Sequence, residues 1–238
     1  MSGGLLFQYA LRQLRARELG ELAERDVVAS LEAARTGPLD FAYLAGVDAR
    51  LPRAELLARG TAVFFNFAAA NLTDDIADGD CTYLPIRAAP GAQFILQNLF
   101  YEVLLSTQVP RADIAQVAGE LVRGASQQQR EVRVKRWTLE LAREVALGIA
   151  GRQYAAYLRL LWAATALAPR AVQVGTDLGV AGHVALDLSC GDPRVATLSE
   201  PDRRALVDWA RAALGRLRAL ELDSVQAAIA GIEPALGA

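Results

Sequence analysis

Apolar side chains recur at intervals of three and four residues along almost the whole of this 238-residue sequence. That interval is the repeat of an α-helix with one buried face, whereas a half-buried strand alternates at every second residue. No segment alternates convincingly, and no internal repeat or linker is visible. We therefore predict an all-α fold in which residues 1–238 form a single domain.

Proline, glycine and short polar runs divide this pattern into about ten helices. The polar run from Ser126 to Arg130 is expected to be a connection or weak turn. Residues 62–72 are apolar on nearly every face, so the middle of their helix is predicted to be buried. The expected helices span residues 5–35 (with a break near Arg17), 38–46, 52–78, 91–107, 111–124, 133–168 (one or two helices), 171–190, 199–220 and 222–232.

The composition excludes several classes of function. Twenty-five basic and 27 acidic residues give a net charge of −2. The chain as a whole therefore has no positive electrostatic field that would attract nucleic acid or an anionic membrane surface. The longest apolar run, residues 160–169, is about half of what a membrane span needs. Arginines follow the N-terminus too soon for a signal peptide, and two cysteines form no disulfide framework, so we expect a cytoplasmic protein. With 53% hydrophobic residues, the chain is expected either to pair with another subunit or to enclose an apolar cavity.

Three aspartates lie at the end of the expected 52–78 helix. At 100° per residue, Asp74, Asp75 and Asp78 share one face of its last turn. Acidic side chains there repel one another and the negative end of the helix dipole, a conflict that a divalent cation would resolve. Ligands that are all oxygen select Mg²⁺, with Mn²⁺ as an alternative. A solvated acidic helix end is the competing interpretation, and the buried run before the aspartates favours the metal. A calcium-binding EF-hand loop is excluded because Ile76 and Pro85 would occupy ligand positions.

Two segments resemble a known family. Leu72-Thr-Asp74-Asp75-Ile-Ala-Asp78 resembles the first aspartate-rich motif, D-D-x-x-D, of trans-isoprenyl diphosphate synthases and the related class I terpene synthases. Leu178-Gly-Val-Ala-Gly-His183-Val-Ala-Leu186-Asp187-Leu-Ser-Cys190 is similar to the second motif, L-G-x-A-F-Q-I-x-D-D-x-x-D. The resemblance covers roughly residues 50–215.

The resemblance implies an antiparallel helical bundle around a deep apolar cavity, with metal carboxylates facing each other across its mouth. Mg²⁺ would then neutralise the substrate diphosphate as the allylic C–O bond ionises. The implied catalytic residues are Asp74, Asp75, Asp78 and Asp187, and the implied metal ligands are these four and Asp192. The cavity is expected to be lined by Phe65, Asn66, Ala69, Ala70, Phe94, Trp137 and His183, although a polar residue packed between helices is the competing interpretation of His183.

The sequence departs from the family in the parts that serve a second substrate. A chain-elongating synthase carries G-G-K-R near its N-terminus and R-R-G after the first motif, and neither is present; residues 81–86 read Cys-Thr-Tyr-Leu-Pro-Ile. The second motif has Leu186 and Cys190 at two of its three aspartate positions. The best basic cluster for the leaving diphosphate, which is alternatively a solvated helix start, is Arg130, Arg133, Lys135 and Arg136.

These losses favour chemistry on one diphosphate. We predict a Mg²⁺-dependent class I terpene synthase-like enzyme, a lyase or cyclase, that ionises a prenyl diphosphate and lets the carbocation cyclise or capture water. A chain-elongating prenyltransferase is the runner-up, and a non-catalytic subunit of a heteromeric prenyl synthase is a further alternative. An unrelated helical interaction module is disfavoured because the second segment supports the first. The family habit of dimerising predicts a homodimer, with a heteromer containing an active synthase as the alternative.

Overall fold

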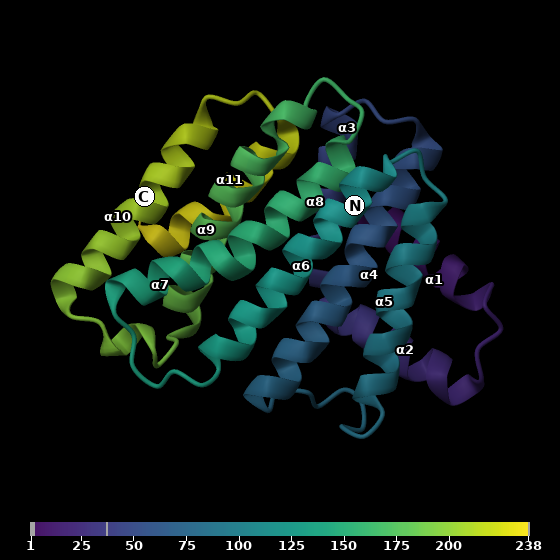
Figure 1. The fold of residues 1–238 in the computed structure, drawn as a ribbon, viewed down its shortest axis with the longest axis horizontal. Coiled ribbons are helices and arrows are strands. Elements are labelled where there is room, and N and C mark those ends of the chain that lie inside the picture. The colour runs from purple at the N-terminus through teal and green to yellow at the C-terminus, as the bar shows by residue number, and fades with distance from the viewer. Residues whose placement is uncertain (1–2, 37, 238) are drawn as a thin grey trace. The chain divides into compact units, whose positions relative to one another are not determined.

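The structure, a computed structural model, describes residues 3–36 and 38–237, which form helices joined by turns and loops and include no strand (Figure 1). The predicted all-α fold class is therefore confirmed. The chain forms two compact units, residues 1–109 and residues 110–238, which are described one at a time. None of the described helices has both the length and the apolar character that crossing a membrane requires.

Unit 1 is built around one long buried helix. It contains α1 (Gly3–Arg15), α2 (Glu21–Ala33), α3 (Leu39–Asp48), α4 (Arg53–Asp78) and α5 (Ala89–Leu105). Helix α4 lies alongside α5 and also packs against α1, α2 and α3 (Figure 1). Phe64, Phe65 and Phe100 are fully buried in this core. Burial of these large rings stabilises the unit, since each removes roughly 150–250 Å² from water.

Helix α4 begins and ends where local sequence signals place it. Pro52 is extended (φ −54°, ψ 144°) and precedes the first turn, and Gly79 ends the helix in the left-handed conformation (φ 82°). Glycine adopts this conformation without the steric cost that a Cβ imposes. The predicted buried middle is confirmed, because residues 61–66, 68, 69 and 72 are all buried.

Unit 2 is built around α9 (Ala171–Cys190), which packs against α8 (Arg152–Trp162), α10 (Glu200–Arg218) and α11 (Asp223–Leu236) (Figure 1). The unit also contains α6 (Arg111–Glu131), α7 (Leu139–Ala146) and a π-helical turn, Leu147–Gly151, that joins α7 to α8. Helix α9 approaches its neighbours closely at Gly175 and Gly179, where an added Cβ would lie 2.5 Å from Ala155 Cα and 2.2 Å from the Ala150 carbonyl oxygen. Only glycine permits this packing.

Several of the predicted helix boundaries in unit 2 are wrong: α8 ends at Trp162 and not at residue 168, α11 continues past residue 232 to Leu236, and two further boundaries differ. Helix α6 continues through the polar run Ser126–Arg130, because glutamine and arginine are good helix formers on an exposed face. The helix expected from residue 133 begins at Leu139, after Thr138, whose hydroxyl accepts a hydrogen bond from the Leu141 N–H at 3.2 Å. A side-chain oxygen at this position satisfies one of the free N–H groups of a first helical turn and thereby fixes where the helix starts.

Candidate functional site

The first acidic segment forms the exposed last turn of α4. Asp74 and Asp78 are exposed, and Asp75 is half-buried. The Oδ2 atom of Asp75 accepts hydrogen bonds from Asn71 Nδ2 at 2.8 Å and from the Tyr83 hydroxyl at 2.7 Å. No basic residue lies in this last turn, so the helix itself offers the three carboxylates no cation.

Tyr83 is a site residue that the sequence analysis missed. The chain turns back after Gly79, and the N–H groups of Asp80 and Cys81 donate to the Asp75 carbonyl oxygen at 2.8 and 3.0 Å. This turn brings Tyr83 to Asp75. Burial, followed by the hydrogen bond to Asp75, raises the pKa of Tyr83 far above its ordinary value, so the phenol remains a donor.

The donor chemistry of this segment fits magnesium. Mg²⁺ is commonly held by one or two carboxylates together with water and substrate phosphates, and it does not need a complete cage of protein ligands. Among the described residues, no three His, Cys, Asp or Glu side chains are gathered as a metal cluster. Asp74, Asp75 and Asp78 therefore stay predicted ligands, and the exposure of Asp74 and Asp78 leaves room for a diphosphate to complete the coordination.

The second acidic segment lies at the end of α9. Asp187 is buried, and its Oδ2 lies 3.5 Å from His183 Nε2, one helical turn earlier. Leu186, at the family's leading aspartate position, is 63% exposed, and Cys190 is also exposed. This segment therefore presents one buried carboxylate where the family presents three aspartates.

Arg194 is a second residue that the sequence analysis missed, and it follows the second acidic segment in the chain. Its guanidinium forms ion pairs with Asp192 at 2.6 Å and with Glu131, at the end of α6, at 2.7 Å. Its Cζ atom lies 5.3 Å from the centre of the Trp137 ring. Burial acts to raise the pKa of Asp192, but hydrogen bonds from Arg194 outweigh it and lower that pKa. Hydrogen bonding to Asp192 likewise raises the pKa of Arg194.

The predicted diphosphate-binding residues are all exposed. Arg130 pairs with Glu144, and an Nη1–H of Arg133 donates to the carbonyl oxygen of Gln129. Lys135 and Arg136 lie in the connection before α7. Their binding role stays a prediction, and it requires Arg130 to exchange Glu144 for the substrate.

The predicted cavity residues fall into different environments. Phe65 and Ala69 are buried in the core of unit 1, Ala70 is half-buried, and buried Asn66 donates to Gln97 Oε1 at 3.3 Å. In unit 2, Trp137 is buried against Arg194 and His183 lies beside Asp187. Phe94 lies on α5 and is 70% exposed, so its place in a cavity stays a prediction.

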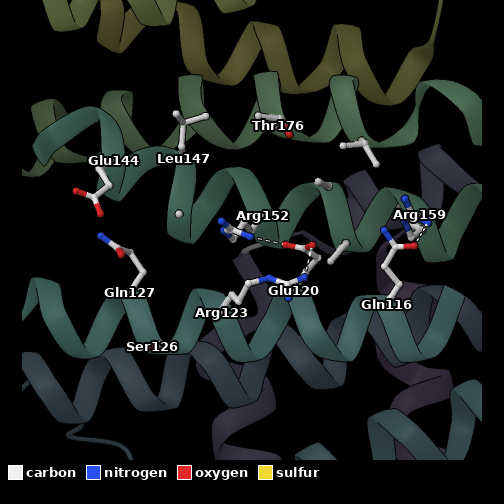
Figure 2. A pocket seen from close by; sticks show the side chains of 14 residues that line it. Gln116, Glu120, Arg123, Ser126, Gln127, Glu144, Leu147, Arg152, Arg159 and Thr176 are labelled. Atoms are coloured by element: carbon white, nitrogen blue, oxygen red, sulfur yellow. Dashed lines mark hydrogen bonds and ion pairs between the residues drawn. The ribbon is translucent and has the colours of Figure 1, made fainter. Parts of the chain in front are cut away.

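Unit 2 contains a pocket of about 720 Å³ between α6, the π-helical turn, α8 and α9 (Figure 2). None of the predicted site residues lines it. Arg123 and Arg152 both donate to Glu120, at 2.5 and 2.7 Å, and Arg159 donates to Gln116 at 2.7 Å. The walls therefore carry paired charges, unlike the apolar well that the resemblance implies.

Neither a protein-family model nor a curated protein matches the sequence. Solved structures do resemble it. They include an isoprenoid synthase family member from Thermotoga neapolitana, with 17% identity over 98% of each chain and a TM-score of 0.76. A geranyltransferase from Legionella pneumophila has 18% identity over 99% of this chain and 94% of its own, with a TM-score of 0.69. A geranylgeranyl pyrophosphate synthetase from Geoglobus acetivorans has 14% identity over 100% and 98%, with a TM-score of 0.68.

The chain therefore has the fold of the isoprenoid synthases. The resemblance to the trans-isoprenyl diphosphate synthase superfamily, which the two aspartate segments indicate, is confirmed at the level of the fold.

Proposed function

We propose that this chain is a Mg²⁺-dependent prenyltransferase that extends an allylic prenyl diphosphate with isopentenyl diphosphate. The proposal is supported by the likeness, over nearly the full length of both chains, to solved structures named as a geranyltransferase and a geranylgeranyl pyrophosphate synthetase. These neighbours favour transfer over the lyase or cyclase reaction that the missing cationic motifs predict.

The proposed reaction begins when the allylic C–O bond breaks and its electron pair leaves with the diphosphate. The double bond of isopentenyl diphosphate then forms a C–C bond to the allylic carbon, and loss of a proton restores a double bond. Mg²⁺, when bound, would neutralise charge on the departing diphosphate. Asp74, Asp75 and Asp78 would hold it, and Tyr83 would keep Asp75 oriented through its hydrogen bond.

Chemistry on a single diphosphate is the second candidate. It is favoured by the absence from the sequence of the G-G-K-R and R-R-G segments that serve isopentenyl diphosphate in the family. In that case the carbocation would cyclise or capture water. A non-catalytic subunit of a heteromeric synthase is a third candidate, favoured by the loss of two aspartates from the second segment.

We further propose that the chain forms a homodimer. Phe94 and Leu105, 70% and 59% exposed, lie eleven residues apart on α5. Eleven residues are close to three helical turns, so both side chains lie on one face of the helix. Burial of that face against a second copy would remove apolar surface from water.

Product analysis separates these candidates. The protein is incubated with Mg²⁺ and C10, C15, C20 or C25 prenyl diphosphates, with and without isopentenyl diphosphate, and the products are identified by mass spectrometry. We expect longer prenyl diphosphates only when isopentenyl diphosphate is present, and none in samples with excess chelator. A hydrocarbon or alcohol formed from one substrate alone would replace transfer with the lyase reaction. No turnover by the protein alone would contradict both enzymatic candidates and favour the subunit.

Replacement of Tyr83 by phenylalanine tests the support of Asp75. The variant removes one of the two side-chain donors to Asp75 Oδ2, and we expect affinity for Mg²⁺ to fall by about tenfold to a hundredfold, as for other partners of metal ligands. The measurement is the Mg²⁺ concentration that gives half-maximal activity, together with direct Mn²⁺ binding. Tyr43→Phe on α3 is the matched control. An unchanged Mg²⁺ dependence in Tyr83→Phe would show that Asp75 needs no such support.

A further inference from the structure

One arginine in unit 2 pairs with two buried carboxylates, and a third buried carboxylate lies on α9, the helix that ends just before Asp192. The side chains of Glu131, Asp187 and Asp192 are only 9%, 10% and 9% exposed. Glu131 lies on α6, Asp187 on α9, and Asp192 in the turn after α9. Arg194 forms ion pairs with Glu131 and Asp192, and its positive charge also attracts Asp187. Buried carboxylates require compensating charge, because removal of an ion from water costs several kcal/mol.

The hydrogen bonds of the guanidinium occupy both oxygens of Asp192. Arg194 Nε donates to Oδ1 and Oδ2, each at 3.1 Å, and Nη2 donates to Oδ2 at 2.6 Å. The backbone N–H of Arg194 adds a bond to Oδ1 at 2.6 Å. Nη1 lies 2.7 Å from Glu131 Oε1. Bidentate charge-assisted bonds of this kind are among the strongest that proteins form.

The backbone holds this arginine in place from both sides. Gly191 adopts a left-handed conformation (φ 69°), and the Asp192 N–H donates to the Asp187 carbonyl oxygen at 2.9 Å. After Arg194, the Thr197 hydroxyl accepts a hydrogen bond from the Trp137 N–H at 2.9 Å. Trp137 in turn places its ring face against the guanidinium. The turn at Gly191 therefore fixes the position of Asp192, and the Trp137 ring restricts the position of the Arg194 guanidinium.

We infer that Arg194 is a tethered cation that supplies the positive charge of this cluster, so that Asp187 and Asp192 do not bind a divalent metal ion. A metal ion on Asp192 would have to displace the guanidinium from both oxygens and would then be repelled by it at short range. The second segment thus does not fit the magnesium that the resemblance implies. The inference rests on the proposed function only in assigning metal binding to the Asp74 segment.

The first test measures Mn²⁺ binding by electron paramagnetic resonance, with inorganic diphosphate as the anionic partner. We expect Asp187→Asn to leave the number and affinity of bound Mn²⁺ ions unchanged within about twofold, and Asp74→Ala to abolish binding. The outcome in Asp187→Asn decides the inference. Binding weakened tenfold or more by Asp187→Asn would overturn it, even where the turnover assay succeeds.

The second test measures thermal unfolding in the absence of metal. Arg194→Gln leaves buried carboxylates without their cation, and we expect its Tm to fall by roughly 10 °C. Arg204→Gln is the matched control, because Arg204 is exposed and pairs with Glu200 on the surface of α10. Addition of Mg²⁺ is expected to raise the Tm of Arg194→Gln by more than that of the control, since the vacated cluster then accepts an ion in addition to any bound at the Asp74 segment.

A third variant keeps this test informative if Arg194→Gln does not fold. Arg194→Lys retains the charge but loses the bidentate geometry, so its Tm is expected to lie between those of the wild type and Arg194→Gln. An Arg194→Gln that behaves like the control would overturn the inference, and so would an Arg194→Lys that fails to fold as Arg194→Gln does, because its charge is retained. Failure of turnover with these Tm results intact would contradict the proposed function while supporting the tethered cation.

Discussion

Asp74→Ala is expected to lower turnover of prenyl diphosphates by about a thousandfold or more. Metal stabilisation of a departing diphosphate contributes several kcal/mol, and each ~1.4 kcal/mol corresponds to a tenfold change in rate. Asp74 is exposed at the end of α4, so its removal leaves no cavity in the core and folding is expected to be normal. The measurement is kcat/KM at saturating Mg²⁺, with circular dichroism as the check on folding.

Asp80→Ala is the matched control for this substitution. Asp80 is an exposed aspartate just beyond the end of α4, and it lies outside the D-D-x-x-D pattern. Its loss is expected to change kcat/KM by less than about threefold, in keeping with a surface substitution away from bound groups. Equal losses in the two variants would point to general electrostatics, and retained turnover in Asp74→Ala would remove the metal assignment.

Gly179→Ala is expected to destabilise unit 2 by roughly 3 kcal/mol, at the upper end of what overpacking usually costs. The added Cβ would lie 2.2 Å from the Ala150 carbonyl oxygen and 2.7 Å from the Gly151 nitrogen, and both are backbone atoms of the π-helical turn. Backbone cannot rotate away as a flexible side chain can, so α9 or the turn must move. Thermal unfolding measures the effect, expected as a Tm lower by roughly 6–12 °C.

Gly215→Ala supplies the control of opposite sign. Gly215 lies on the exposed face of α10 and an added Cβ would meet nothing within 4 Å. Alanine restricts the unfolded chain more than glycine does, so this substitution is expected to stabilise by roughly 0.5–1 kcal/mol. A Tm of Gly179→Ala at or above that of the wild type would show that α9 and the turn are not in close contact.

The fold class and the bounds of α4 and α9 were predictable because their signals are local. Pro52 and the aspartates before Gly79 bound α4, and Pro169 and Gly191 bound α9, each within about a residue or two. The polar run at Ser126 misled because glutamine-rich segments are compatible with both a connection and an exposed helix. The start of α7 depends on the cap at Thr138, a single hydrogen bond that hydrophobic spacing does not reveal.

The candidate site was predictable only where its residues are neighbours along the chain. Asp74, Asp75 and Asp78 share a helical turn, so spacing alone places them on one face. Tyr83 reaches Asp75 through a turn, and Arg194 meets Glu131 and Trp137 from a distant segment. Those contacts depend on backbone conformations after Gly79 and Gly191 and on the packing of α6 against its neighbours. No periodic pattern encodes them.

The arginine of the second segment also has a consequence for how unit 2 depends on its surroundings. A bound ion is present only in proportion to its free concentration, and a chelator removes it. A charge attached to the chain is delivered at a fixed effective concentration from the moment the chain folds. With Arg194 between Asp192 and Glu131, unit 2 brings its own counter-ion to this cluster and can complete its fold in a metal-poor medium.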